Sequence, residues 1–181
     1  IYEDYFEELK ILSYSDFINN SENSALVAGT IMSIQEKKSA KGTPFAVIKF
    51  SDLKSEFELF LFSDLLISNR EKLKAADSFI LTLQKDSLTE GNTTRRINVK
   101  NIRTLDDFVK KSYDNVIIEV NEKSNLNELQ SLLKENGDTK IQIKMKKSSK
   151  IYLFSLKNLR KFNFTTFKNI RGKEYVKKIS F

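Results

Sequence analysis

The chain has 181 residues, of which 40% are hydrophobic, and it carries a formal net charge of +7 with neither cysteine nor histidine. The length fits one large domain or two small ones. The missing residue types exclude disulfides and Cys or His nucleophiles, and they remove the commonest metal ligands. No apolar run approaches the roughly 20 residues of a membrane span. We therefore expect a cytoplasmic globular protein with no membrane partner and no bound cofactor.

The first 24 residues predict a helical lead-in segment and a linker. Apolar residues recur at spacings of three and four, which places them on one side of a helix: Tyr2, Tyr5, Phe6, Leu9 and Leu12. A short second helix is expected around residues 14–18, and the polar run 19–24 is typical of a linker. Because the chain begins inside this pattern and without methionine, we expect a piece of a longer protein.

Residues 25–104 change to a period of two, which is typical of β-strands. Five strands are predicted, at residues 25–36, 45–52, 56–62, 78–85 and 95–102. A helix within residues 63–77 separates the third strand from the fourth. This order of elements predicts a five-stranded OB-fold barrel. Gly29 lies inside the long first strand, where a bulge or bend lets one strand serve both halves of a small barrel.

Residues 105–181 predict a small α+β domain, so the whole chain is expected to be mainly β with an α+β part. Strands are expected at residues 116–120, 141–145, 151–154 and 175–179. A helix is expected at residues 125–135, with Ser124 as its cap and Gly137 at its end. This segment is also the most basic, because residues 137–181 hold 13 Lys or Arg against 2 acidic residues. Basic segments are typical of nucleic-acid binding, although AT-rich codons produce the same Lys-rich composition.

The second and third strands of the predicted barrel indicate which of their faces points outward. Lys49 is too costly to bury unpaired, so Phe45 and Val47, on its side of the strand, are expected to face solvent. Glu58 in the third strand places Phe60 outside by the same argument, whereas Phe62 at the strand end could turn either way.

This outward face combines aromatic rings with cations, which is the combination that binds single-stranded nucleic acid. The candidate nucleic-acid-binding residues are Lys37, Lys38, Lys41, Phe45, Lys49, Phe60, Arg95 and Arg96. The two arginines lie in or next to the loop between the fourth and fifth strands, and this loop and the first hairpin flank the binding groove in OB-folds. Two alternatives stay open: the phenylalanines could form a seam to another domain, and the arginines could belong to an ordinary solvated hairpin end.

The stretch "VAGTIMSIQEKKSAKGTPFAVIKFSDLKSEFELFLFSDLL", residues 27–66, resembles the OB domain of the bacterial DNA polymerase III alpha subunit. In that family a V-A-G strand leads to a basic hairpin ending in K/R-G, then to a strand finishing near D, and then to E-V-x-F. The matching residues are Val27, Ala28, Gly29, Lys41, Gly42, Phe45, Asp52, Phe57, Glu58 and Phe62. The resemblance covers residues 25–104, and residues 105–181 are similar in order and length to the family's C-terminal domain.

The resemblance implies a supporting role in DNA replication. The OB domain of the family is associated with single-stranded template DNA, and its last domain contacts the clamp-loader tau subunit. Other polymerase domains would lie upstream, and the intact chain would be a DNA-directed DNA polymerase. The acidic residues that hold catalytic magnesium in the family are not in this chain, nor is its sliding-clamp motif.

No catalytic or metal-binding residues are predicted within these 181 residues. There is no Gly-rich phosphate loop, and the tightest acidic pair, Asp106 and Asp107, lies at an expected helix start, where carboxylates serve the cap. We therefore expect a non-catalytic region that binds single-stranded DNA and docks to a protein partner. The alternatives are a purely structural, partner-binding module and a free-standing single-strand-binding protein.

Overall fold

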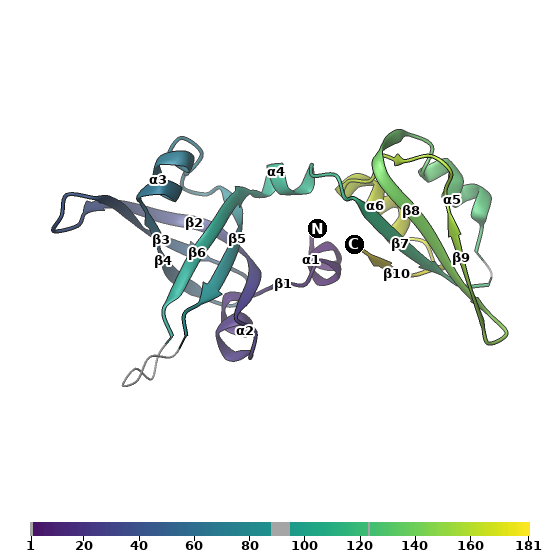
Figure 1. Cartoon of the computed structure of the whole chain (residues 1–181), viewed down its shortest axis with the longest axis horizontal. Helices are drawn as coiled ribbons and strands as arrows, with labels where there is room; N and C mark the ends of the chain where they lie inside the picture. Colours follow the sequence, from purple (N-terminus) through teal and green to yellow (C-terminus); the bar gives the residue numbers. More distant parts are fainter. Residues whose placement is uncertain (1, 88–94, 123) are drawn as a thin grey trace. The chain divides into compact units, whose positions relative to one another are not determined.

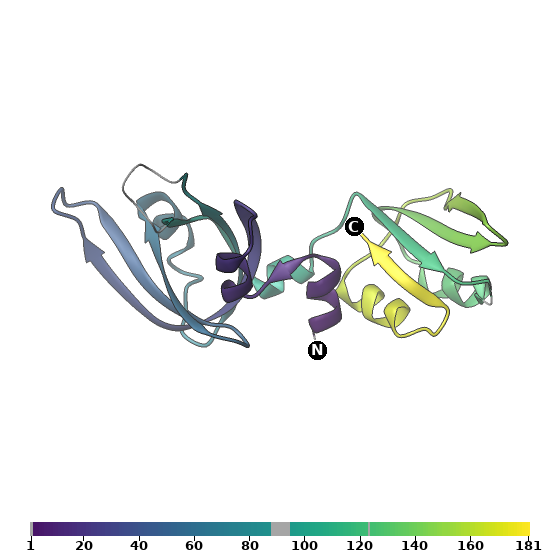
Figure 2. The ribbon, with the colours of Figure 1, turned by 90° about the horizontal axis from the view of Figure 1, so that it is seen from below.

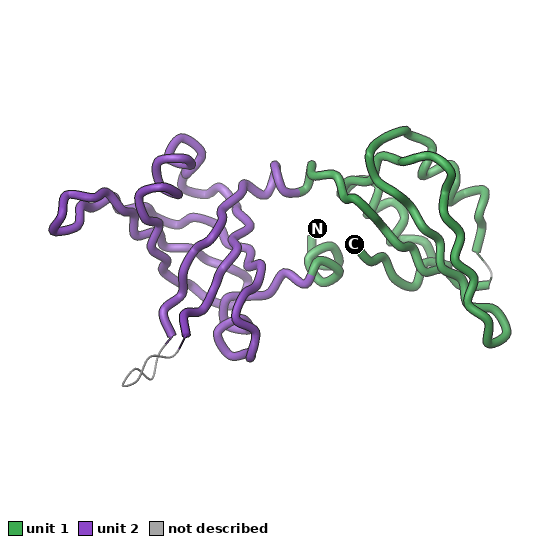
Figure 3. Tube along the Cα trace, in the orientation of Figure 1, with its two compact units in different colours: residues 1–9, 109–181 green, residues 10–108 purple. Residues whose placement is uncertain are grey.

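The computed structural model describes residues 2–87, 95–122 and 124–181 (Figure 1). The chain is mainly β, as the sequence predicts. It divides into two compact units, residues 10–108 and residues 1–9 together with 109–181 (Figure 3). The predicted lead-in segment 1–24 is therefore shared between the two units, and the later boundary falls within the short helix α4 (Leu105–Val109).

The unit of residues 10–108 contains one six-stranded sheet. Five strands follow the path β4-β3-β2-β5-β6, and the short β1 pairs in parallel with β2. The strands are β1 (Ile11–Leu12), β2 (Ser24–Lys38), β3 (Pro44–Ser51), β4 (Glu56–Phe62), β5 (Ser78–Lys85) and β6 (Ile97–Thr104). The helices are α2 (Tyr14–Asn19) and α3 (Ser63–Asn69), the latter between β4 and β5. The outer strands β4 and β6 lie next to each other, but no strand pairing joins them in the part of the chain that the structure describes.

The core of this unit lies on one face of the sheet. Along β3 every second residue is fully buried, namely Ala46, Ile48 and Phe50, as expected from the outward assignment of Lys49. Gly29 is not at a bulge, but the first long strand does serve both halves of the sheet as predicted, because β2 pairs with β5 over residues 24–30 and with β3 over residues 30–38. Gly29 is buried where an added Cβ would lie 3.1 Å from the Phe57 ring and 3.3 Å from Phe50, so its role is close packing. The register shift in β2 falls between Ile31 and Ser33 instead.

The predicted N-terminal helix is shorter than its apolar stripe. Helix α1 (Glu3–Glu8) ends before Lys10, which has a φ of 55°. Leu12 therefore lies not on the helix but in β1, where it pairs with Val27 and packs against the core of the unit 10–108. The prediction of one helix is wrong because Leu12, in the short strand β1, follows Leu9 at the three-residue spacing that is also typical of a helix.

The other unit contains a four-stranded sheet of order β10-β7-β8-β9. Its strands are β7 (Asn115–Val120), β8 (Asn136–Lys147), β9 (Lys150–Ser155) and β10 (Val176–Ser180). Helix α5 (Leu126–Leu132) joins the parallel strands β7 and β8, and α6 (Phe164–Arg171) precedes β10. Both helices pack together on one side of this sheet (Figure 2). Among the described residues, no helix is long and apolar enough to cross a membrane.

The ends of α5 differ from the prediction. Asn125, not Ser124, is its N-cap, and the Asn125 side chain accepts a hydrogen bond of 3.1 Å from the Glu128 N–H. The helix ends at Leu132 with Leu133 as its C-cap, and Gly137 lies in β8. A Cβ at Gly137 would lie 2.5 Å from the backbone of Lys161, so this glycine permits a close backbone approach.

Helix α1 contributes an aromatic residue to the core of this second unit. Tyr5 is 1% exposed, and its ring contacts those of Phe164, Phe167 and Phe181 at centroid distances of 4.9–5.8 Å. The hydroxyl groups of Tyr5 and Tyr113 form a short hydrogen bond. Burial raises the pKa of Tyr5, and the hydrogen bond to Tyr113 adds to this shift. Burial also raises the pKa of Tyr113.

These raised pKa values predict a loss of stability in alkaline solution. The ordinary pKa of a tyrosine is 10.0, so above that pH the folded unit holds protons that the unfolded chain has released. The contribution of these two tyrosines to the free energy of unfolding of this unit should therefore be constant below about pH 10 and fall above it. Urea denaturation followed by circular dichroism across this range would measure the decline. Tyr5→Phe should decline less steeply, and an equal slope in both proteins would contradict the assignment.

Candidate nucleic-acid interface

The outer face of β3 and β4 carries the aromatic residues that the sequence singles out. On β4 the residues Phe57, Leu59 and Leu61 are buried, whereas Phe60 is 44% and Phe62 is 46% exposed. The pairing of β3 with β4 places Phe45 opposite Phe62. Phe62, whose direction the sequence left open, therefore joins Phe45 and Phe60 on one face.

The three phenylalanine rings form a continuous cluster. Ring centroids are 6.3 Å apart for Phe45 and Phe60, 6.5 Å for Phe45 and Phe62, and 6.4 Å for Phe60 and Phe62. The rings of Phe60 and Phe62 are inclined by only 14°. The half-exposed rings of Phe60 and Phe62, in nearly parallel planes, offer flat apolar surfaces on which nucleobases stack, and the ring of Phe45 is tilted by 32–33° to both.

Arg96 completes this cluster from the other end of the sheet. Its guanidinium carbon lies 5.1 Å from the centroid of the Phe62 ring, and Arg96 itself is exposed. The contact joins the start of β6 to the end of β4. An arginine on an aromatic face is held in a defined position while its charge stays available to a phosphate. Phe45, Phe60, Phe62 and Arg96 are called the aromatic cluster below.

The lysines of the β2–β3 hairpin lie on different sides of it. Lys37 pairs with Phe45 and so shares the face of the aromatic cluster, whereas Lys38 pairs with Pro44 and faces the opposite way. The hairpin extends beyond the rest of the sheet (Figures 1 and 2). Lys41 lies in its exposed turn, where Gly42 takes a φ of 79° that favours glycine.

Lys49 lies on the predicted outer face, but its charge is compensated. Its ammonium group is 2.6 Å from a carboxylate oxygen of Glu56, and Glu58 is its partner across the strands. The hydrogen bond to Glu56 holds the pKa of Lys49 above its usual value. Lys49 is thus a weaker candidate for a phosphate contact than Lys37.

Arg95 and Lys85 surround the beginning of β2. Arg95 donates a hydrogen bond of 2.9 Å to the Asn23 side chain, whereas the adjacent Arg96 contacts the Phe62 ring. Lys85 is 7% exposed, and its ammonium group donates to the Asn20 carbonyl at 2.7 Å and lies 4.7 Å from the Phe17 ring. Burial lowers the pKa of Lys85. These contacts give Lys85 a structural role, although the sequence did not distinguish it from the exposed lysines.

The structure therefore brings together Lys37, Phe45, Phe60 and Arg96, adds Phe62, and separates Lys38 and Arg95 from them. The loop residues 88–94, which the sequence places beside the two arginines, lie outside the described residues. No family model matches this chain, and no curated protein matches it. Within the described ranges, no group of three or more Asp, Glu, His or Cys residues is arranged to hold a metal ion.

Proposed function

We propose that residues 10–108 form an OB-fold module that binds single-stranded nucleic acid across the outer face of β3 and β4. The observation that carries this proposal is the aromatic cluster, in which the half-exposed rings of Phe60 and Phe62, the partly buried ring of Phe45 and one arginine share a surface. Bases stack on such rings without sequence selection, and each nucleotide brings a negative charge to Arg96 and Lys37. Weak to moderate affinity with little sequence preference is expected.

The order of elements supports the OB-fold part of the proposal. The path β4-β3-β2-β5-β6, with α3 between β4 and β5, is the order of the five OB strands with their helix. The neighbouring positions of β4 and β6 and the contact of Phe62 with Arg96 are consistent with a barrel in which the outer strands approach. In an OB-fold, the face of the second and third strands is the binding surface.

From the resemblance of residues 27–66, we propose that this module belongs to the C-terminal part of a bacterial replicative DNA polymerase alpha subunit. The module would contact single-stranded template DNA, and the unit containing residues 109–181 would dock to the clamp-loader tau subunit. Catalysis would belong to domains upstream. The strongly basic composition of residues 137–181 is compatible with docking to an acidic partner surface.

Phe60→Ala tests the nucleic-acid contact. It should weaken binding of a labelled single-stranded oligonucleotide by roughly fivefold to 150-fold, since stacking contributes about 1–3 kcal/mol per base. Fluorescence anisotropy at two salt concentrations measures this. Ile67→Ala, which changes another exposed apolar residue on α3, is the matched control and should bind normally.

A comparison of Lys37→Glu with Lys38→Glu tests which face of the hairpin contacts nucleic acid. Both substitutions change the charge by the same amount, but the two side chains point to opposite faces. Lys37→Glu should weaken binding and reduce its salt dependence more than Lys38→Glu does. Equal effects would mean that the hairpin acts only through its total charge. If the unaltered protein does not bind at low salt, the aromatic cluster is instead a seam to another protein domain.

A further inference from the structure

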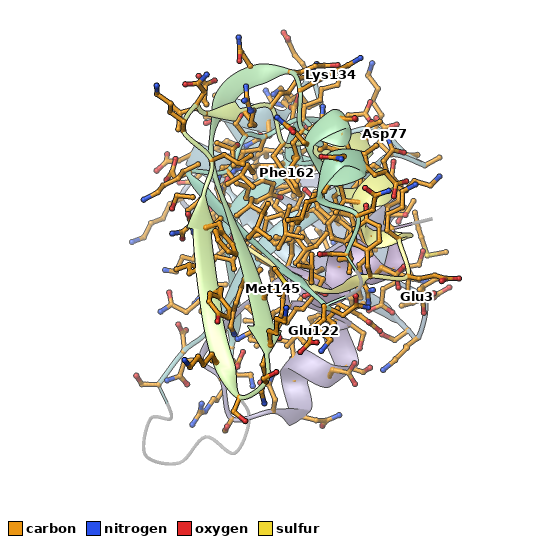
Figure 4. All side chains as sticks on the ribbon, turned by 90° about the vertical axis from the view of Figure 1, so that its right-hand side faces the viewer. Glu3, Asp77, Glu122, Lys134, Met145 and Phe162 are labelled. Atoms are coloured by element: carbon orange, nitrogen blue, oxygen red, sulfur yellow. The ribbon has the colours of Figure 1, made fainter. Side chains whose placement is uncertain are left out.

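Strand β9 exposes an unusual amount of apolar surface. Four consecutive residues are 42–63% exposed, namely Ile151, Tyr152, Leu153 and Phe154. The strand forms the outer border of the four-stranded sheet, next to β8, which carries Met145 (Figure 4). Contiguous exposed apolar residues on a sheet edge mark a surface that another chain covers.

Within the part of the chain that the structure describes, no strand pairs with the outer side of β9. The Leu156 N–H donates to the Ile141 carbonyl at 2.9 Å, and the Lys140 N–H donates to the Asp114 carbonyl at 3.0 Å. Odd-numbered residues of β8 therefore face β9 and even-numbered residues face β7. The β9 partners of Ile143 and Met145 are Phe154 and Tyr152. The alternate residues of β9, Ile151, Leu153 and Ser155, consequently direct their N–H and C=O groups to the free edge.

The opposite edge of the same sheet is protected in the usual way. Strand β10 exposes Lys177 and Lys178, while its apolar residues Val176 and Ile179 are buried. Exposed lysines on an edge strand discourage pairing with another chain. In β9 the only charged residue is Lys150, at the first position, and the central residues are apolar. The contrast between the two edges indicates that β9 can pair with a strand from another chain.

The charges around β9 indicate the chemistry of the occupant. Lys146 and Lys147 are exposed opposite Ile151 and Lys150, and Lys157 follows the strand. Of the nearby acids, Glu119 pairs with Lys144 at 3.1 Å, and Glu122 accepts the Ser148 N–H at the hairpin turn. A second copy of this chain would bring the same excess of lysines to the edge. Tyr152 and Phe154 also form a pair of half-exposed, nearly parallel rings with centroids 6.3 Å apart. The row of backbone N–H and C=O groups at the edge, however, matches the backbone of a peptide strand and not a nucleobase.

We propose that β9 is the docking edge for an acidic, extended peptide segment of a partner protein. The segment adds a strand beside β9, exchanges hydrogen bonds with Ile151, Leu153 and Ser155, and places its carboxylates near Lys146, Lys147 and Lys150. This inference rests on the docking role proposed for the unit that contains residues 109–181, and it names the surface and the partner chemistry.

Leu153→Pro tests strand addition directly. Proline at this position removes an N–H that faces the free edge and leaves the hydrogen bonds between β8 and β9 in place. The probe is a short fluorescent peptide of alternating glutamate and valine, titrated against the whole 181-residue chain. The unaltered protein should bind it, and Leu153→Pro should bind at least about tenfold more weakly. The same peptide with its central residue replaced by proline should not bind.

Leu153→Lys carries the test if Leu153→Pro does not fold, which circular dichroism would reveal. This variant adds positive charge but protects the edge, so strand addition predicts weaker peptide binding. Tighter binding would show simple charge attraction and would overturn the proposal. Leu159→Lys adds the same charge at another exposed leucine outside β9 and should not weaken binding.

Three further outcomes would overturn the proposal. In the first, the unaltered protein does not bind the peptide. In the second, single-stranded DNA displaces the bound peptide in a manner that depends on Leu153. In the third, the unaltered protein is a dimer that Leu153→Pro dissociates. Phe60→Ala distinguishes failure of the proposed nucleic-acid function from failure of the peptide-docking proposal, because this variant should bind the peptide normally. Leu153→Pro should in turn bind single-stranded oligonucleotide normally.

Discussion

Ile48→Asp is expected to unfold the unit of residues 10–108. Ile48 is 0% exposed at the centre of β3, and its cross-strand neighbours are Ile34 on β2 and Leu59 on β4. An aspartate there has no partner within the apolar core, so either a charge is buried or the carboxyl stays protonated at a large cost. That cost is several kcal/mol, comparable with the roughly 5–15 kcal/mol by which a domain is stable.

Val47→Asp is the matched control, because Val47 is the adjacent residue and points to the opposite face. Amide hydrogen exchange measured by mass spectrometry would follow both variants peptide by peptide. Ile48→Asp should remove the protection of β2, β3 and β5, whereas Val47→Asp should keep it. A protected Ile48→Asp variant would mean that the inward and outward faces of β3 had been exchanged.

The direction of each residue in β3 and β4 was predictable from the sequence. A strand alternates with a period of two, so one costly residue on each strand, Lys49 or Glu58, decides the face of all the others. The burial of Ala46 and Leu61 and the exposure of Phe60 follow this rule. The end of a strand is less constrained, so the sequence does not determine the face on which Phe62 lies. Its pairing with Phe45 determines that face.

Contacts between distant segments were not predictable in the same way. Arg96 lies on the ring of Phe62 because the two outer strands of the sheet approach each other, and no local pattern encodes that distance. The division of the hairpin lysines depends on register. Lys38 is opposite Pro44 and Lys37 is opposite Phe45, and a shift of one residue would exchange them.

Two glycines show how packing changes the meaning of a sequence signal. Gly29 predicts a bulge or bend and Gly137 a helix end, because those are the common local uses of glycine. In the structure both allow a close approach, of aromatic rings to Gly29 and of the Lys161 backbone to Gly137. Such approaches involve segments that are far apart in the chain. The sequence therefore indicates that glycine is needed at these two positions, but it does not show which segment approaches them.

Tyr5→Ala is expected to destabilise the unit of residues 1–9 and 109–181 by about 3–5 kcal/mol, the range for removing a large buried ring. Tyr5 is 1% exposed and contacts three aromatic rings, so the substitution leaves a cavity among Phe164, Phe167 and Phe181. It also removes the hydrogen-bond partner of the Tyr113 hydroxyl group. Helix α1 has little stability of its own at this length, and its packing depends on this side chain.

Hydrogen exchange would locate this effect. Amides of β7, β8 and β10 should exchange about a hundredfold faster or more in Tyr5→Ala, while those of β2 and β5 should be unchanged. Glu7→Ala, an exposed substitution on the same helix, should leave both sets unchanged because alanine favours the helix. Faster exchange confined to β2 and β5 would contradict the assignment of residues 1–9 to this unit. The expected result would instead establish that the chain leaves one unit after Leu9, builds the unit of residues 10–108, and returns to complete the first.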